Sequence, residues 1–109
     1  MENLESVIFQ IILHGGNGRS ASMEAIQAAK QGEFEHAEGK LKEAENALNE
    51  AHHIQTSLIQ GEIRGETTPM TLLMVHAQDH LMNAITCRDM AAEMVELYKL
   101  IKLPAVSQE

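Results

Sequence analysis

The sequence predicts an all-α protein that folds as an antiparallel three-helix bundle. Aromatic residues, which favour strands, make up only 3% of the 109 residues, whereas Ala, Leu, Met, Glu, Lys and Gln, which favour helices, are abundant. Long stretches also place apolar residues at alternating spacings of three and four, which is the helical period. We therefore expect one domain, residues 1–109, with helices at approximately 3–31, 33–60 and 69–103.

The first expected helix carries a well-spaced apolar stripe, formed by Leu4, Val7, Ile8, Ile11 and Ile12. A glycine-rich stretch then interrupts it at Gly15, Gly16 and Gly18. A serine just beyond could cap a resumed helix, either Ser20 or Ser22. We expect residues 3–31 to form one helix kinked near 15–18, or two short collinear helices.

The second expected helix, 33–60, has a coiled-coil-like seam. Its members alternate at three and four: Phe34, Ala37, Leu41, Ala44, Leu48, Ala51 and Leu58, with Gln55 filling the remaining position. Glu and Lys side chains cover the other face of residues 33–50. Residues 61–67 are expected to form the loop that follows.

The third expected helix starts at Thr68 as N-cap with Pro69 in the first helical position, and Pro104 stops it after about Leu103. Its seam also alternates at three and four: Leu73, His76, His80, Asn83, Cys87, Met90, Met94, Leu97 and Ile101. Apolar residues occur on nearly every side between Leu72 and Ile85. Two partner helices can cover only one side, so we expect another subunit to cover the rest.

Charge and composition exclude several classes of protein. Eight basic against sixteen acidic residues give a net charge of −8, which argues against nucleic acid binding and favours partners with basic surfaces. Cys87 is the single cysteine, so the chain has no internal disulfide. No apolar run approaches the roughly 20 residues that span a bilayer, and the N-terminus does not resemble a signal peptide. We expect a soluble, cytoplasmic protein.

A polar cluster breaks the seam of the third helix. His76, His80 and Asn83 take consecutive seam positions, and Asp79 lies beside them. Burying each without a partner costs about 1–3 kcal/mol, and exceptions of this kind occur at functional sites. Histidines satisfied in a core or interface, an asparagine that fixes register, and a His-x-x-x-His zinc half-site are the alternatives.

Three colinear segments resemble the IIA components of lactose/cellobiose phosphotransferase systems. The first surrounds the polar cluster, Val75-His76-Ala77-Gln78-Asp79-His80-Leu81-Met82. The second is Ala47-Leu48-Asn49-Glu50-Ala51-His52-His53-Ile54-Gln55-Thr56-Ser57-Leu58-Ile59, and the third is Gly18-Arg19-Ser20 leading into Ala28-Ala29-Lys30-Gln31-Gly32-Glu33-Phe34. The similarity covers roughly residues 4–103.

This resemblance implies a phosphocarrier that acts as a homotrimer, a nine-helix bundle. It implies that His76 receives a phosphoryl group from the histidine phosphocarrier protein and passes it to a cysteine of the IIB component, during uptake of a lactose- or cellobiose-type disaccharide. The membrane is then reached only indirectly, through the IIC permease. It further implies that Asp79 lies near the three-fold axis, where three copies ligate one divalent metal.

The residue types suit these roles. Neutral imidazole, with an ordinary pKa of about 6.5, is a nucleophile at physiological pH, and an acceptor on its second nitrogen fixes the tautomer. His80, Gln78 and Asn83 are the candidates for contacts around His76. Gln78 lies roughly 200° around the helix from His76, so it could serve only a neighbouring subunit. Three Asp79 carboxylates would repel one another, and an oxygen-loving cation such as Mg²⁺ would neutralise them.

Other interpretations of the sequence remain open. The glycine stretch ending at Arg19 could offset the phosphoryl charge with backbone amides and a guanidinium, or it could simply bend the helix. The whole chain could be a metal-stabilised assembly that uses His76, His80 and Asp79 as ligands, or a coiled-coil adaptor. A nucleophilic His76 must stay accessible to a partner, whereas a metal ligand is saturated.

Overall fold

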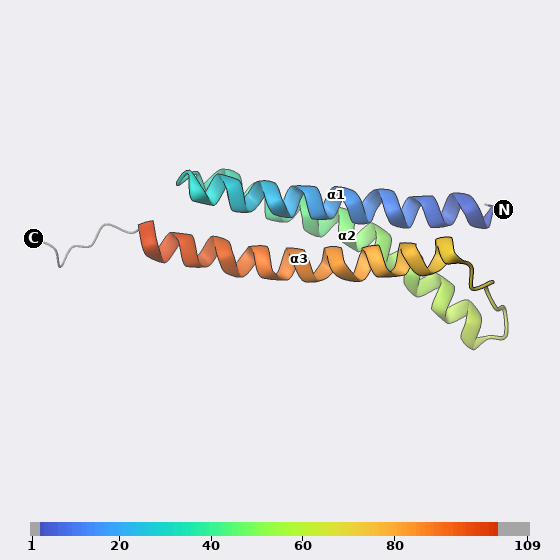
Figure 1. Cartoon of the computed structure of the whole chain (residues 1–109). Helices are drawn as coiled ribbons and strands as arrows, with labels where there is room; N and C mark the ends of the chain where they lie inside the picture. The colour runs from blue at the N-terminus through green and yellow to red at the C-terminus, as the bar shows by residue number, and fades with distance from the viewer. Residues whose placement is uncertain (1–2, 103–109) are drawn as a thin grey trace, which may run out of the picture.

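The structure, a computed structural model, describes residues 3–102 as three helices, which confirms the predicted all-α class. These are α1 (Leu4–Lys30), α2 (Phe34–Ile63) and α3 (Leu72–Lys102). Figure 1 shows that α1 and α3 run side by side in the same direction while α2 returns in the opposite one. Helix α1 packs extensively on both others, whereas α2 and α3 contact each other less. Within residues 3–102, no helix combines the length and the apolar character that a membrane crossing requires.

Helix α1 continues through the glycine stretch, so the predicted bend near residues 15–18 is wrong (Figure 1). The glycines instead allow close helix packing. A Cβ on Gly18 would lie 2.5 Å from Cγ and Cδ2 of Leu48 in α2, and one on Gly15 would lie 3.4 Å from Cδ2 of His80 in α3. Because glycine lacks that carbon, the neighbouring helices can approach the α1 backbone closely.

The serine caps expected after the glycines are also absent, since Ser20 and Ser22 lie inside the continuous helix. Ser22 is fully buried, and its hydroxyl donates to the carbonyl oxygen of Gly18 at 2.8 Å. The N-cap of α1 is Asn3, whose Oδ1 accepts from the backbone nitrogens of Glu5 at 2.7 Å and Ser6 at 3.3 Å.

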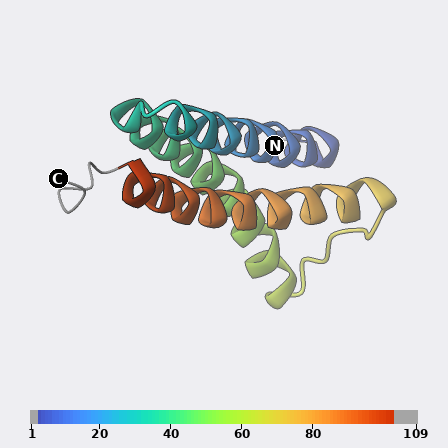
Figure 2. The ribbon, with the colours of Figure 1, turned by 60° about the vertical axis from the view of Figure 1, so that its left-hand side comes forward.

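The seam of α2 lies in the core as the sequence predicted. Its central residues are buried: Ala37, Leu41, Ala44, Leu48, Ala51 and Gln55. The helix extends to Ile63, three residues further than expected. Its C-terminal end diverges from the other two helices (Figure 2), and Ile59 and Ile63 are 53% and 80% exposed.

Helix α3 starts later than predicted because a different threonine caps it. The backbone nitrogen of Met74 donates to Oγ1 of Thr71 at 3.1 Å, and that of Val75 donates to the Thr71 carbonyl at 3.0 Å. Thr68 and Pro69 therefore belong to the connection between the helices. The expected stop at Leu103 and Pro104 lies outside the described residues.

The seam predicted for α3 is displaced by one position, and this is the main correction to the expected fold. The residues that face α1 and α2 are Met74, Ala77, Leu81, Ala84, Ala91 and Val95, all at most 1% exposed. The predicted seam points outward: His76, Asn83, Met90, Met94, Leu97 and Ile101 are exposed, and Leu73, His80 and Cys87 are half-buried. Alanines on the inner face let α3 approach its neighbours, and the larger apolar residues remain outside.

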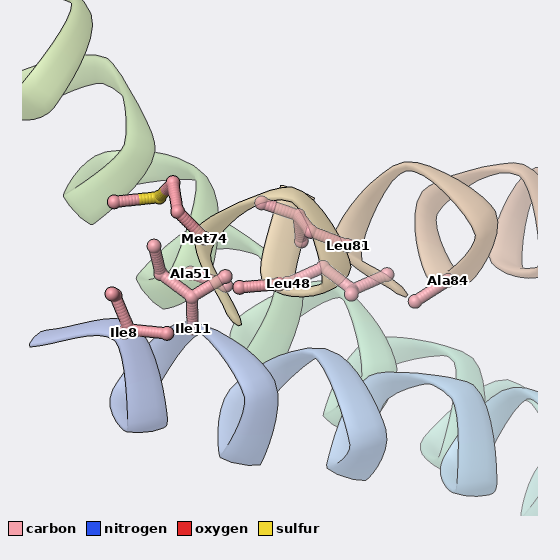
Figure 3. Close-up of a cluster of buried hydrophobic side chains, with 8 residues drawn as sticks. Ile8, Ile11, Leu48, Ala51, Met74, Leu81 and Ala84 are labelled. Atoms are coloured by element: carbon pink, nitrogen blue, oxygen red, sulfur yellow. The ribbon is translucent and has the colours of Figure 1, made fainter. Parts of the chain in front are cut away.

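The core has two apolar clusters along the bundle. Figure 3 shows the first, where Ile8 and Ile11 of α1 meet Leu48 and Ala51 of α2 and the residues Met74, Leu81 and Ala84 of α3. The second lies at the other end and includes Ile26, Leu41 and Val95. The inner face of α3 thus packs into the two core clusters. The polar cluster around His76 lies outside that face.

Candidate functional site

The candidate site occupies two turns of α3, outside the face that packs into the first core cluster, with His80 at the edge next to α1. His76, Asp79 and Asn83 are exposed, and His80 is half-buried. The structure therefore brings together the four residues that sequence analysis grouped, but at the surface of the chain and not in its seam. An exposed His76 has the accessibility that a nucleophile requires.

The two histidines form a stacked pair that α1 supports. The rings of His76 and His80 have centroids 5.9 Å apart and planes inclined by 17°. His80 lies against the glycines of α1, because a Cβ on Gly16 would come within 3.5 Å of His80 Nε2. The glycine stretch thus leaves room for the His80 ring, and that ring in turn supports the ring of His76.

Asp79 lies at the middle of the outer face and has one weak polar contact. Asn83 Nδ2 donates to Asp79 Oδ2 at 3.4 Å, a long hydrogen bond. Over residues 3–102, a single chain assembles no group of three or more His, Cys, Asp or Glu side chains that could hold a metal ion.

Gln78 faces away from the histidine of its own chain and contacts α2. Its Oε1 accepts a hydrogen bond from Nε2 of Gln55, and its Nε2 lies 3.5 Å from Sδ of Met74. Sequence analysis missed the role of Gln55 in this contact. The available signal was the amide at position 55 in an otherwise apolar seam.

Most basic side chains are already engaged in ion pairs. Lys40 bridges Glu24 at 2.9 Å and Glu43 at 3.0 Å, and these hydrogen-bonded carboxylates raise the pKa of Lys40 above its ordinary value. Lys42, Arg64, Arg88 and Lys99 also pair with glutamates. Among basic side chains that the structure describes, Arg19 and Lys30 have no ion pair. Helix α1 is continuous through the glycines, so their backbone amides are not set free beside Arg19, which was one of the two roles considered for this stretch.

Arg88 is a second polar residue that sequence analysis missed. It takes an inner-face position of α3, its Nε is buried without a hydrogen-bond partner, and its guanidinium lies 3.7 Å from Glu45. It borders a cleft of about 260 Å³ between α2 and α3, lined by Glu45, Leu48, Asn49, His52, Ile85, Arg88 and Asp89. This cleft does not include His76. The one-residue error in the α3 seam is the reason that Arg88 was overlooked.

Comparison with known proteins identifies the family. Residues 6–99 match the model of the family described as "PTS system, Lactose/Cellobiose specific IIA subunit". The chain belongs to this family. It is therefore a IIA component of the phosphotransferase system, as the sequence motifs predicted.

Curated relatives of this IIA component are named for different sugars. The chain is 66% identical over 100 residues to the lichenan-specific phosphotransferase enzyme IIA component of Bacillus subtilis, covering 92% of this chain and 91% of that protein. It is 40% identical over 101 residues to the N,N'-diacetylchitobiose-specific EIIA component of Escherichia coli, covering 93% and 87%.

Solved structures of family members have the same fold. The cellobiose-specific enzyme IIA of Bacillus anthracis superposes with a TM-score of 0.89 at 53% identity, covering 94% of both chains. The IIA protein in the solution structure of the Escherichia coli IIA(chitobiose)–HPr complex superposes with a TM-score of 0.82 at 38% identity, covering 94% of this chain and 99% of that one. The relative in that complex is bound to HPr, a phosphotransferase-system protein.

Proposed function

We propose that His76 carries the phosphoryl group of this IIA component. It accepts the group from a histidine phosphocarrier protein and passes it to a cysteine of a IIB component, during uptake of a lactose- or cellobiose-type disaccharide. The observation that carries this proposal is the exposed His76 side chain, stacked on His80 at the flank of the outward face of α3. A partner can reach an exposed side chain, which a buried structural histidine would not allow.

Each transfer exchanges one phosphorus bond for another. A ring nitrogen of neutral His76 attacks with its lone pair, a new N–P bond forms, and the bond between phosphorus and the donor nitrogen breaks with its electron pair returning to the donor. In the second transfer a cysteine thiolate attacks, an S–P bond forms, and His76 recovers its lone pair. The phosphoryl group moves as a unit. The carrier therefore needs an accessible imidazole whose attacking nitrogen is oriented toward the phosphorus atom.

The outer face of α3 supports assembly as a homotrimer. Large apolar side chains remain exposed along its whole length: Leu72, Val75, Met82, Met90, Met94, Leu97, Leu100 and Ile101. A continuous apolar stripe of this kind indicates a protein contact, and packing three copies of α3 around one axis would cover it. Asp79 lies in the middle of this stripe, so the axis would bring three carboxylates together.

Those carboxylates fit a divalent metal of the Mg²⁺ type. Mg²⁺ prefers oxygen ligands and retains several waters, and one carboxylate from each chain would supply three ligands. Residues 3–102 of one chain form no group of three such ligands, so the proposed site is the axis of the assembled protein. Its proposed role is to neutralise charge at the axis, and phosphoryl transfer itself takes place at His76.

The same assembly would place Gln78 beside a neighbouring histidine. His76 and Gln78 are only two residues apart along α3, and they flank its outer face on opposite sides. In a cyclic arrangement one flank of each copy meets the opposite flank of the next. Gln78 of one chain would therefore face His76 of its neighbour at nearly the same height along the axis.

Intact-mass analysis tests the proposed carrier. The protein is incubated with phosphoenolpyruvate, enzyme I and the histidine phosphocarrier protein. We expect an acid-labile gain of one phosphoryl group per chain, and we expect this gain to be lost in His76→Ala. His36→Ala, which changes an exposed histidine of α2, is the matched control and should behave as wild type. No gain with an active donor would instead favour a metal-stabilised assembly without phosphoryl chemistry.

A further inference from the structure

Gln55 is an amide in a place where the packing pattern calls for an apolar residue. It is 8% exposed, and along α2 it follows Leu41, Ala44, Leu48 and Ala51 in the buried seam. An unpaired amide there would be destabilising, and an apolar side chain would avoid that cost. The reason for an amide at this position must therefore be the hydrogen bond that Gln55 makes.

Its hydrogen bond is to Gln78, two residues after the proposed phosphorylated histidine. Gln55 Nε2 donates to Gln78 Oε1, so the carbonyl end of the Gln78 side chain is occupied. The amino end of Gln78 is not strongly engaged, because its neighbour at 3.5 Å is the thioether sulfur of Met74, a weak acceptor. Gln78 thus has N–H donors to spare, and its side-chain oxygen is held toward Gln55.

This polarity matches the chemistry of a phosphoryl group, whose oxygens only accept hydrogen bonds. An unrestrained Gln78 could turn either its oxygen or its nitrogen toward the phosphoryl group, and the oxygen would repel it. We propose that Gln55 is a positioning residue for phosphoryl transfer, which fixes Gln78 so that its N–H groups face the phosphorylated His76 of a neighbouring copy. This inference rests on the proposed function.

Single-turnover phosphorylation of His76 by the donor protein tests the proposal. Gln55→Met keeps the length of the side chain but removes the donor, and it should slow the transfer about threefold while leaving the unfolding temperature unchanged or higher. Gln55→Glu should slow it tenfold or more, because an ionised carboxylate accepts from Gln78 and turns its oxygen outward. Sedimentation under the same conditions shows whether association has changed.

A double-mutant comparison separates positioning from packing. In a Gln78→Met background, replacing Gln55 with Met or Glu should have no further effect on the rate, since Gln55 acts through Gln78. Rates for Gln55→Met and Gln55→Glu equal to wild type would overturn the proposal, as would effects that persist in the Gln78→Met background. If wild type itself gains no phosphoryl group, the proposed function fails; if it does and these rates do not change as stated, the inference alone fails.

Discussion

The two faces of α3 differ in the size of their residues more than in their polarity. The inner face includes the fully buried alanines Ala77, Ala84 and Ala91 between larger buried residues. The outer face has larger apolar residues such as Met90 and Leu97, about half-exposed, together with the histidines. The face of α3 that packs on α1 and α2 is the one whose alanines let the helix backbones come close. The larger apolar side chains remain on the outer face, where other chains can contact them.

The largest expected difference between the faces comes from truncating an apolar side chain on each. Leu81 is fully buried, so Leu81→Ala should lower the free energy of unfolding by about 2–5 kcal/mol. Met90 is 53% exposed, so Met90→Ala should alter association and leave unfolding of the dissociated chain nearly unchanged. Urea unfolding at low protein concentration measures both. Equal losses of unfolding free energy in the two variants would show that both faces of α3 contribute alike to the stability of the single chain.

Glycine substitutions test the close approach directly. In Gly18→Ala the new Cβ would overlap Leu48, and we expect a loss of about 1–3 kcal/mol. Gly39 lies inside α2 with nothing within 4 Å of a new Cβ, so Gly39→Ala should gain about 0.5–1 kcal/mol from helix propensity. Thermal unfolding of both variants gives the comparison, and a stabilising Gly18→Ala would refute tight packing at this point.

Exchanging charge and apolarity on the outer face tests the proposed axis. Leu97 lies 18 residues after Asp79, five full helical turns, so both point the same way. Asp79→Leu removes three like charges from the axis and should leave the assembly intact or tighter by severalfold. Leu97→Asp adds three charges at the same face and should weaken it by tenfold or more. Sedimentation velocity across a concentration series measures both, and dissociation of Asp79→Leu would contradict the axial arrangement.

The smallest expected effect concerns the polar edge of the inner face, near Arg88. The pKa of Glu45 is lowered, first by its hydrogen bond to Lys42, then by the Lys42 charge, and further by the Arg88 charge. A lowered pKa in the folded state stabilises the fold above the unfolded pKa, and this contribution is lost as the pH falls through the folded value. Lys42→Met should therefore raise the pKa of Glu45 toward 4.5, whereas Lys30→Met should not. NMR titration of the Glu45 carboxyl follows the change.

The sequence was sufficient for the number of helices, their order and the seam of α2, because periodicity and glycine or proline signals determine these locally. It was not sufficient for the seam of α3. The prediction assigned the core face to the larger apolar residues, whereas the alanines one position further along the helix lie in the core. The start of α3 was missed because Thr68 and Thr71 are both acceptable caps. Which threonine is used depends on how the connection folds.

The polar residues show the same division between local and tertiary information. The grouping of His76, Asp79, His80 and Asn83 follows from helical spacing alone, and the structure brings them together. The contact between Gln55 and Gln78 depends on the register of α2 against α3, which no local pattern encodes. The support of His80 by Gly16 likewise depends on how α1 lies on α3.

The divergence of the C-terminal end of α2 divides this helix into two parts with different local stability. From Ala37 to Ala51 its seam is enclosed, so its amides should exchange with solvent only through large openings of the bundle. The last two turns have Ile59 and Ile63 exposed and should open at much lower free energy. Gln55 is the last seam residue of α2 in the buried row, and Leu58, the next one, packs only partly buried against the first core cluster before the helix begins to fray.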